Sequence, residues 1–183
     1  IVVCGVNGVQ PNTRRMYQEA TTRSLGRAVV VNKIDCDKAD FAGAVAAIRE
    51  TFGRHCVPFD VPDADGPAFA RVLSVLDPPA DIPSGCPMDP REVRSQLIDA
   101  VVEADDALME KYLTDGTVSA EELEAAIPQA IAAGTLVPIF CTSAKRDQGV
   151  RELLDALGRY GLSPTYSRRR LQGLTVGHNG HAR

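Results

Sequence analysis

Short apolar runs separated by a polar, helix-periodic segment dominate the first part of the chain. Residues 1–4 and 28–31 have the length and β-branched content of strands buried on both faces of a parallel sheet. Between them a helix is predicted over about 11–24, because Pro11 suits the first helical turn and Gly26 follows its end. This pattern predicts a strand–helix–strand unit, the building block of a parallel α/β sheet.

The alternation of strands and helices changes after the second strand. Apolar positions recurring every three or four residues predict a helix over about 39–52, closed by Gly53. Residues 54–90 are then rich in proline and contain short strand candidates at 56–61 and 69–76. This indicates a small β-containing insertion with long loops rather than further strand–helix units.

Two helices are expected after the proline-rich region. An apolar stripe predicts one continuous helix over about 91–113. Ser119 followed by Glu122 is a capping-box signature for the next helix, which we expect to end at Gly134. Pro128 lies inside this helix and should kink or divide it, because proline lacks the N–H that the helix needs.

One more strand and one more helix complete the pattern. Residues 136–141 form an apolar strand, and Pro138 within it favours a position at the edge of the sheet. Asp147 is expected to cap a final helix. The apolar positions of that helix should face the core: Val150, Leu153, Leu154 and Leu157. Residues 165–183 lack core periodicity, and we expect a disordered tail there.

Composition is that of an ordinary globular chain. The 183 residues, 44% hydrophobic and 24% charged, suit one domain with room for a subdomain. The net charge of −4 gives no general electrostatic case for binding DNA or a membrane surface. The five cysteines form no C-x-x-C pair, which favours reduced thiols in a cytoplasmic protein. No apolar run approaches the ~18 residues of a membrane-spanning helix.

The most informative polar residues stand directly after two predicted strands. Asn32-Lys33-Ile34-Asp35 follows the strand at 28–31, and Thr142-Ser143-Ala144-Lys145 follows the strand at 136–141. Open α/β sheets bind ligands at the carboxyl ends of their strands. Either motif alone is weak, because polar residues after a strand often serve only as a turn and helix cap. Their occurrence together, in this order, favours a pair of guanine-reading loops.

The residue types of the first loop fit guanine. One carboxylate can accept from both the ring N1–H and the exocyclic N2 amine, so Asp35 is the candidate for a charge-assisted contact worth roughly 1.5–3 kcal/mol. Adenine lacks the matching donors and would leave the carboxylate unpaired. Asn32 can hold the loop and reach the base edge, while the stem of Lys33 can cover one face of the ring.

The second loop offers a complementary set of groups. The backbone N–H of Ala144 is expected to donate to the guanine O6 oxygen. Ser143 would shape the turn, and the stem of Lys145 would cover the other ring face.

A different group, Glu103, Asp106 and Glu110, would share one face of the expected long helix. A solvated acidic face fits these three better than a metal site, because nothing supplies the buried partners that a metal site needs.

Several stretches resemble the GTP-binding domain of bacterial elongation factor G, the ribosomal translocase. Besides the two loops, the resemblance includes Gly8-Val9-Gln10-Pro11-Asn12-Thr13, the segment Ala104–Leu113 and the strand Leu136–Cys141. Asp35 and Ser143 lie 108 positions apart (143 − 35), whereas a minimal G domain has one crossover helix between these loops. An insertion of this kind is what the elongation factor G family carries as an extra subdomain.

The resemblance implies a fold, a ligand and partners. The fold would be α/β: the C-terminal part of a P-loop NTPase-like G domain, a mostly parallel sheet flanked by helices with an α+β inserted subdomain. Residues 1–40 and 135–164 would form the partial GTP-binding domain, and 41–134 the insertion. The ligand would be GTP or GDP. The partners would be the ribosome and, through the insertion, the ribosomal stalk protein. Nucleotide contacts carry over only to Asn32, Lys33, Asp35, Ser143, Ala144 and Lys145.

The chain departs from the family in the parts that perform catalysis. It contains no G-x-x-x-x-G-K-[ST] phosphate loop and no Asp-x-x-Gly followed by a catalytic histidine, so no residue receives a catalytic or metal-binding role. We therefore expect a piece of a GTPase, inactive alone, with Mg²⁺ bound only in the intact protein. Two alternatives stay open. One is another ribosome-associated translational GTPase, such as a ribosomal protection or recycling factor. The other is a non-catalytic, degenerate G domain that only binds.

Overall fold

A parallel sheet forms the centre of the protein in the computed structural model, which describes residues 1–162. Its four strands are β1 (Val2–Cys4), β2 (Val29–Asn32), β3 (Cys56–Pro58) and β6 (Val137–Thr142), in the spatial order β1-β2-β6-β3. All three strand pairs are parallel, which agrees with the strand–helix–strand pattern expected for the first residues. The predicted fold class, a mostly parallel α/β sheet flanked by helices, is confirmed.

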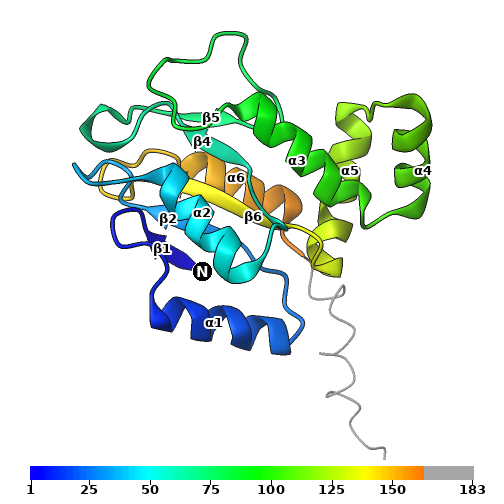
Figure 1. Cartoon of the computed structure of the whole chain (residues 1–183), viewed down its shortest axis with the longest axis horizontal. Helices are drawn as coiled ribbons and strands as arrows, with labels where there is room; N and C mark the ends of the chain where they lie inside the picture. Colours follow the sequence, from blue (N-terminus) through cyan, green and yellow to red (C-terminus); the bar gives the residue numbers. More distant parts are fainter. Residues whose placement is uncertain (163–183) are drawn as a thin grey trace, which may run out of the picture.

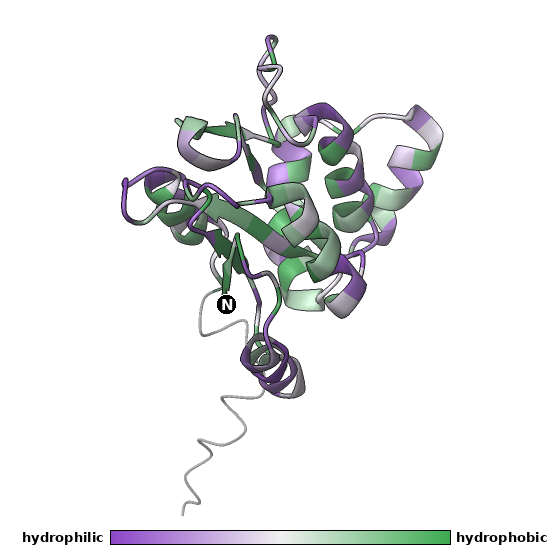
Figure 2. Ribbon diagram, turned by 60° about the vertical axis from the view of Figure 1, so that its left-hand side comes forward, coloured by the Kyte–Doolittle hydropathy of each residue, from purple (hydrophilic) through white to green (hydrophobic). Residues whose placement is uncertain are grey.

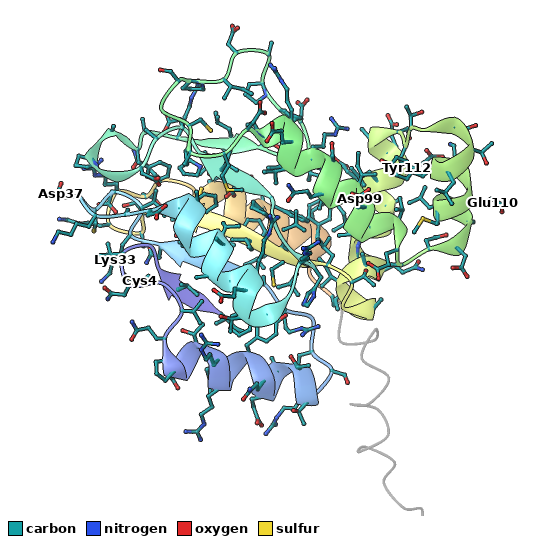
Figure 3. All side chains as sticks on the ribbon, viewed as in Figure 1. Cys4, Lys33, Asp37, Asp99, Glu110 and Tyr112 are labelled. Atoms are coloured by element: carbon teal, nitrogen blue, oxygen red, sulfur yellow. The ribbon has the colours of Figure 1, made fainter. Side chains whose placement is uncertain are left out.

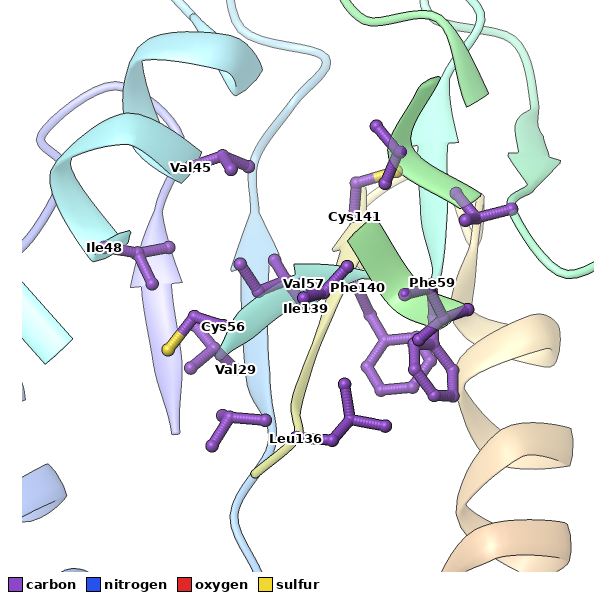
Figure 4. Close-up of a cluster of buried hydrophobic side chains, with 14 of the residues drawn as sticks. Val29, Val45, Ile48, Cys56, Val57, Phe59, Leu136, Ile139, Phe140 and Cys141 are labelled. Carbon is purple, nitrogen blue, oxygen red and sulfur yellow. The ribbon is translucent and has the colours of Figure 1, made fainter. Parts of the chain in front are cut away.

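Helices cover both faces of this sheet. α2 (Phe41–Phe52) and α6 (Val150–Tyr160) lie on opposite sides of β6, while α1 (Pro11–Thr22) connects β1 to β2 (Figure 1). Val45 and Ile48 of α2 point toward one face of the strands, and Phe59 and Phe140 lie on the side of α6 (Figure 4). Aromatic packing continues there into Tyr160, whose ring centroid is 5.9 Å from that of Phe59.

A second group of elements lies beside the main sheet (Figure 1). It contains a two-stranded antiparallel sheet of β4 (Asp60–Pro62) and β5 (Val72–Ser74), with the short 3₁₀ turn η1 (Gly66–Ala68) between the strands. Three helices follow: α3 (Pro90–Val102), α4 (Asp106–Asp115) and α5 (Ala120–Ala133). α3 packs against β3, α4 and α5. The region expected as an insertion thus contributes both this group and one strand, β3, of the main sheet.

The expected continuous helix over 91–113 is wrong: the structure has two helices, α3 and α4. The backbone leaves the helical path near Ala104, and Asp105 then caps α4 by accepting hydrogen bonds from the N–H groups of Ala107 and Leu108 at 3.0 and 3.1 Å. An aspartate side chain competes with the helix for backbone donors, which favours a new helix start. The apolar spacing continued across this break and concealed it.

Pro128 does not divide α5, contrary to one of the expected outcomes. The helix begins with the predicted capping box of Ser119 and Glu122 and ends at Gly134 in the left-handed conformation. Its apolar face is buried against the core, including Leu123 and Ile127. Burial of this face outweighs the single backbone hydrogen bond that the proline removes.

Pro138 occupies an interior strand, so the expected position at the sheet edge is wrong. β6 lies between β2 and β3. The β2–β6 ladder begins one residue later, at the pair Val29 and Ile139, while on the β3 side Val137 donates to the carbonyl of His55 at 2.8 Å. The missing N–H of Pro138 therefore falls before the first pair with β2, at the start of the strand, where proline is tolerated.

The final helix begins later than expected. Its N-cap is Gly149, not Asp147, because the backbone of Ser143 and Gln148 pairs in a tight loop that uses the intervening residues. Leu153 packs against the core, but Leu154 and Leu157 are 61% and 48% exposed. The apolar stripe of this helix is thus wider than the surface that the described residues bury.

Hydrophobic residues gather where the elements meet, and hydrophilic residues cover the outward faces of the helices (Figure 2). The core includes the strands β2 and β6, α2 and the inward faces of α3 and α5. Within residues 1–162 no helix has the length and apolarity needed to cross a membrane. The expected tail over 165–183 lies outside the described residues.

Candidate guanine-nucleotide site

The two motif loops lie side by side because their strands are neighbours. β2 and β6 pair directly, with Asn32 opposite Thr142 at the carboxyl ends of both strands. Just beyond, the N–H of Ile34 donates to the carbonyl of Thr142 at 3.3 Å. Residues separated by more than a hundred positions are thereby placed at one end of the sheet, where α/β folds bind ligands.

Asn32 connects the two loops through one atom. Its Oδ1 oxygen accepts hydrogen bonds from the N–H of Lys33 at 2.8 Å, the N–H of Ala144 at 3.1 Å and the hydroxyl of Thr142 at 3.3 Å. The first bond is local, and the other two join the loops. Asn32 is half-buried, so these bonds are partly shielded from water.

Lys33 is held in an unusual backbone conformation. Its φ is +69°, in the left-handed region that residues other than glycine seldom adopt, and its side chain is exposed. Lys33 lies at the same end of the molecule as Asp37, beyond the end of β2 (Figure 3). Strained residues of this kind concentrate at binding sites, where the surrounding structure enforces them.

Asp35 and Arg146 bring opposite charges together across the loops. The distance between Arg146 Nε and Asp35 Oδ2 is 3.6 Å, and the Asp35 side chain is only 10% exposed. The candidate base-reading carboxylate therefore lies in a partly desolvated position with a cationic neighbour. Partial desolvation strengthens the charge-assisted hydrogen bonds that a carboxylate accepts from a ligand.

The second loop is a compact turn. Ser143 is fully buried, and it exchanges backbone hydrogen bonds of 2.9 and 3.1 Å with Gln148. Its hydroxyl also accepts from the N–H of Arg146 at 3.2 Å, which fits the expected role of Ser143 in shaping the turn. Ala144 and Lys145 are exposed at the tip. The Ala144 N–H already donates to Asn32, so a guanine O6 would share this donor or take it over.

Residues 66–70, which comprise η1 and the two residues after it, contact both loops, a feature that the sequence patterns did not predict. The N–H of Gly66 donates to the carbonyl of Ile34 at 2.8 Å, and the side-chain amide of Gln148 donates to the carbonyl of Ala70 at 3.0 Å. Arg146 Nη1 lies 3.0 Å from the carbonyl oxygen of Pro67. No local motif predicts these contacts, because each joins positions far apart in the chain.

Asp60 is a second residue that the sequence analysis missed. Its side chain is fully buried, and its Oδ1 accepts a 2.7 Å hydrogen bond from the N–H of Cys141, just before the second loop. The main-sheet pairing of β3 with β6 ends at Pro58 and Ile139. The Asp60 carboxyl then takes the place of a backbone carbonyl. Burial raises the pKa of Asp60 to about 7.

The acidic residues considered as an alternative site do not share one helix. Glu103 is the C-cap of α3, whereas Asp106 and Glu110 belong to α4. Figure 3 shows Glu110 on α4, away from the end of the sheet that carries Lys33. Across residues 1–162, no three His, Cys, Asp or Glu side chains are grouped as metal ligands would be. The six candidate nucleotide contacts, in contrast, all lie in the two adjacent loops.

The fold is that of a G domain of a translational GTPase. Residues 1–162 match the family model described as the elongation factor Tu GTP binding domain, and the chain belongs to this family. The chain is also similar to a solved structure from Thermus thermophilus, titled "Crystal structure of ttk003000868", with a TM-score of 0.77 and 30% sequence identity. The match covers 89% of this chain and 26% of the other, so the chain spans about a quarter of that protein's length.

Proposed function

We propose that this chain is the guanine-recognition part of an elongation factor G-like GTPase. The observation that carries the proposal is the joining of both motif loops by Asn32 at the ends of neighbouring strands. Family membership makes guanine nucleotide, GTP or GDP, the expected ligand. The loop geometry supports specific roles for individual side chains within that expectation.

Each candidate residue receives the role that its position allows. Asp35 accepts from the N1–H and N2 amine of guanine, and Asn32 holds the two loops together at the base edge. Ala144 donates to O6 from a turn that Ser143 stabilises. The exposed stems of Lys33 and Lys145 cover opposite faces of the ring. None of these residues contacts phosphate, so hydrolysis requires groups beyond these six.

In the full-length protein, we propose ribosome-dependent GTP hydrolysis that drives movement of tRNA and mRNA. Mg²⁺ and the phosphate-binding groups belong to that proposal, as do the ribosomal contacts. Residues 1–40 and 135–164 would form the GTP-binding domain, and 41–134 the insertion that contacts the ribosomal stalk. The main-sheet strand β3 falls inside the latter range, so the insertion proper would begin after Pro58.

A ribosomal protection or recycling factor is a close alternative, because such a factor would share the base-reading loops. A degenerate domain that binds guanine nucleotide without hydrolysing it is a second. Single-turnover GTP hydrolysis by the full-length protein, with and without ribosomes, separates the degenerate domain from the GTPases. Translocation of tRNA on programmed ribosomes separates an elongation factor from the other ribosomal GTPases.

The sharpest test of base reading is Asp35→Asn. The amide replaces one acceptor with a donor, which suits the O2 carbonyl of xanthine and opposes the N2 amine of guanine. We expect the Kd for GDP to rise by at least about tenfold and the Kd for XDP to fall, because an unmatched polar group in a half-buried site is strongly disfavoured. Isothermal titration calorimetry on the full-length protein measures both.

Asp37→Asn is the matched control, since Asp37 is an exposed acid two residues along the same segment. It should leave both dissociation constants within about twofold, as expected for an exposed charge. If GDP is still preferred over XDP after Asp35→Asn, Asp35 does not read the base. If the unmodified protein binds GDP no better than ADP, guanine recognition itself is excluded.

A further inference from the structure

Arg146 is attached to three different parts of the protein. Its backbone N–H donates to the hydroxyl and to the carbonyl of Ser143, at 3.2 and 3.1 Å. Its Nη1 lies 3.0 Å from the carbonyl oxygen of Pro67 and 3.4 Å from that of Phe69. Its Nε lies 3.6 Å from Asp35 Oδ2. The guanidinium therefore joins the second loop, residues 66–70 and the carboxylate of the first loop.

The two carbonyl contacts restrict the movement of the Arg146 guanidinium, because they hold it on the side away from Asp35. The two carbonyl oxygens attract one end of the planar group, and the other end is left facing the carboxylate. A guanidinium has five N–H donors in a fixed fork, so it can satisfy the carbonyls and the carboxylate at the same time. The side chain of Arg146 is 39% exposed, whereas that of Asp35 is 10% exposed, so the pair lies at the border of the site.

We propose that Arg146 is a positioning residue that orients the Asp35 carboxylate for guanine, and that it thereby sets discrimination between guanine and hypoxanthine. The inference rests on the proposed reading of guanine by Asp35. Arg146 attracts Oδ2 on the protein side and so limits rotation of the carboxylate about its last torsion. Both oxygens then remain aligned with two adjacent donors of a base.

Hypoxanthine tests this alignment because it lacks only the N2 amine. A carboxylate that is free to rotate still accepts from N1–H, but it holds the second bond poorly. Loss of Arg146 should therefore weaken guanine binding more than hypoxanthine binding. A merely structural contribution of Arg146 to the loops would weaken both bases equally.

The opposite role for Arg146, competition with the base for the Asp35 carboxylate, is also testable. Arg146 would compete with the base for Asp35 if its ion pair occupied the carboxylate oxygen that the base needs. The fixed attachment of Nη1 to the two carbonyls opposes this role, since it holds the guanidinium on one side of Oδ2. A carboxylate oxygen has a second lone pair and can accept from both a base and Arg146. Competition predicts that removing Arg146 tightens GDP binding.

The experiment is Arg146→Gln in the full-length protein, with GDP and IDP affinities measured by isothermal titration calorimetry. Glutamine keeps a side chain with an N–H donor and removes the charge. We expect the Kd for GDP to rise about tenfold and the Kd for IDP about twofold or less, so that the IDP/GDP ratio of dissociation constants falls about fivefold. Arg151→Gln is the control, since Arg151 is an exposed arginine on α6. It should leave the ratio unchanged.

Arg146→Lys provides a second variant. An ammonium keeps the charge near Asp35 but cannot span the carbonyls and the carboxylate together, so an intermediate ratio is expected. Thermal unfolding of each variant verifies the fold. An unchanged IDP/GDP ratio in both variants overturns the proposal, as does equal weakening of GDP and IDP, or tighter GDP binding. If the unmodified protein fails to prefer GDP over ADP, the proposed function fails first, which is a separate result.

Discussion

Asn32 holds the candidate site together with a single side-chain oxygen that accepts three hydrogen bonds. Two of the donors belong to the second loop, so the oxygen supplies a link that neither strand provides. Lys33, next in the chain, has a left-handed backbone conformation with a φ of +69°. Asn32 thus acts at this site by holding the backbone of the two loops together.

Asn32→Ala should raise the Kd for GDP about tenfold, because the N–H of Ala144 and the hydroxyl of Thr142 lose their shared acceptor and the loops separate. Stability should fall by about 1 kcal/mol, since the exposed Ala144 N–H can bond to water instead. Calorimetry and thermal unfolding measure the two effects. Asn32→Asp keeps the accepting oxygen and should retain more affinity. Equal losses in the two variants would show that the link between loops is unimportant.

Among the elements, α6 shows how the start of a helix depends on the loop before it, here the turn from Ser143 to Gln148. The helix starts at Gly149, whose φ of +71° and close approach to the Cys141 carbonyl leave no room for a side chain. The turn from Ser143 to Gln148 is thereby brought back against the end of β6. Gly158, in the same helix, has open space around its Cα within the described residues.

These two glycines form a matched pair for mutation. Gly149→Ala should destabilise the protein by about 2–4 kcal/mol, because the new methyl group would collide with the Cys141 carbonyl in a left-handed backbone. Gly158→Ala should stabilise it by about 0.5–1 kcal/mol, because alanine favours a helix interior. Thermal unfolding compares the stability of the two variants with that of the unmodified protein. Destabilisation by Gly158→Ala would mean that something covers this surface of α6.

At the level of the whole molecule, Asp60 connects the small β4–β5 sheet with the main sheet. Its carboxyl is buried against β6 and bonded to the N–H of Cys141. Burial raises its pKa to about 7, opposed by the hydrogen bond from Cys141 and assisted by the negative charge of Glu152. Burial also raises the pKa of the neighbouring Cys141 thiol, so this thiol stays protonated.

This raised pKa predicts how stability changes with pH. Between about pH 4 and pH 7 the folded protein holds a proton on Asp60 that the unfolded chain releases, so stability falls as pH rises through this window. We expect Asp60 to contribute a loss of roughly 1–3 kcal/mol between pH 5 and pH 8. Denaturant unfolding of Asp60→Asn, which keeps an accepting oxygen, should show a smaller loss. Identical pH dependence in both proteins would exclude Asp60 as the titrating group.

Local information in the sequence was sufficient for most elements and for the identity of the motif loops. The strands β1, β2 and β6, the helices α1 and α2 and the capping box of α5 were predicted within a few residues, because period, caps and glycine stops act over one or two turns. The six candidate contacts were also named from residue types that follow apolar strands. Their roles toward a nucleotide stay predictions.

Tertiary structure alone decided which strands are neighbours, and with that the surroundings of the site. It placed Pro138 in an interior strand, ended one helix before Asp105, and left Leu154 and Leu157 exposed. It also brought Arg146 to Asp35 and Asp60 to Cys141. The sequence by itself determined the local elements and identified the two motif loops, since both depend on neighbouring residues. The long-range contacts depend on how the whole chain packs, and no local pattern encodes that packing.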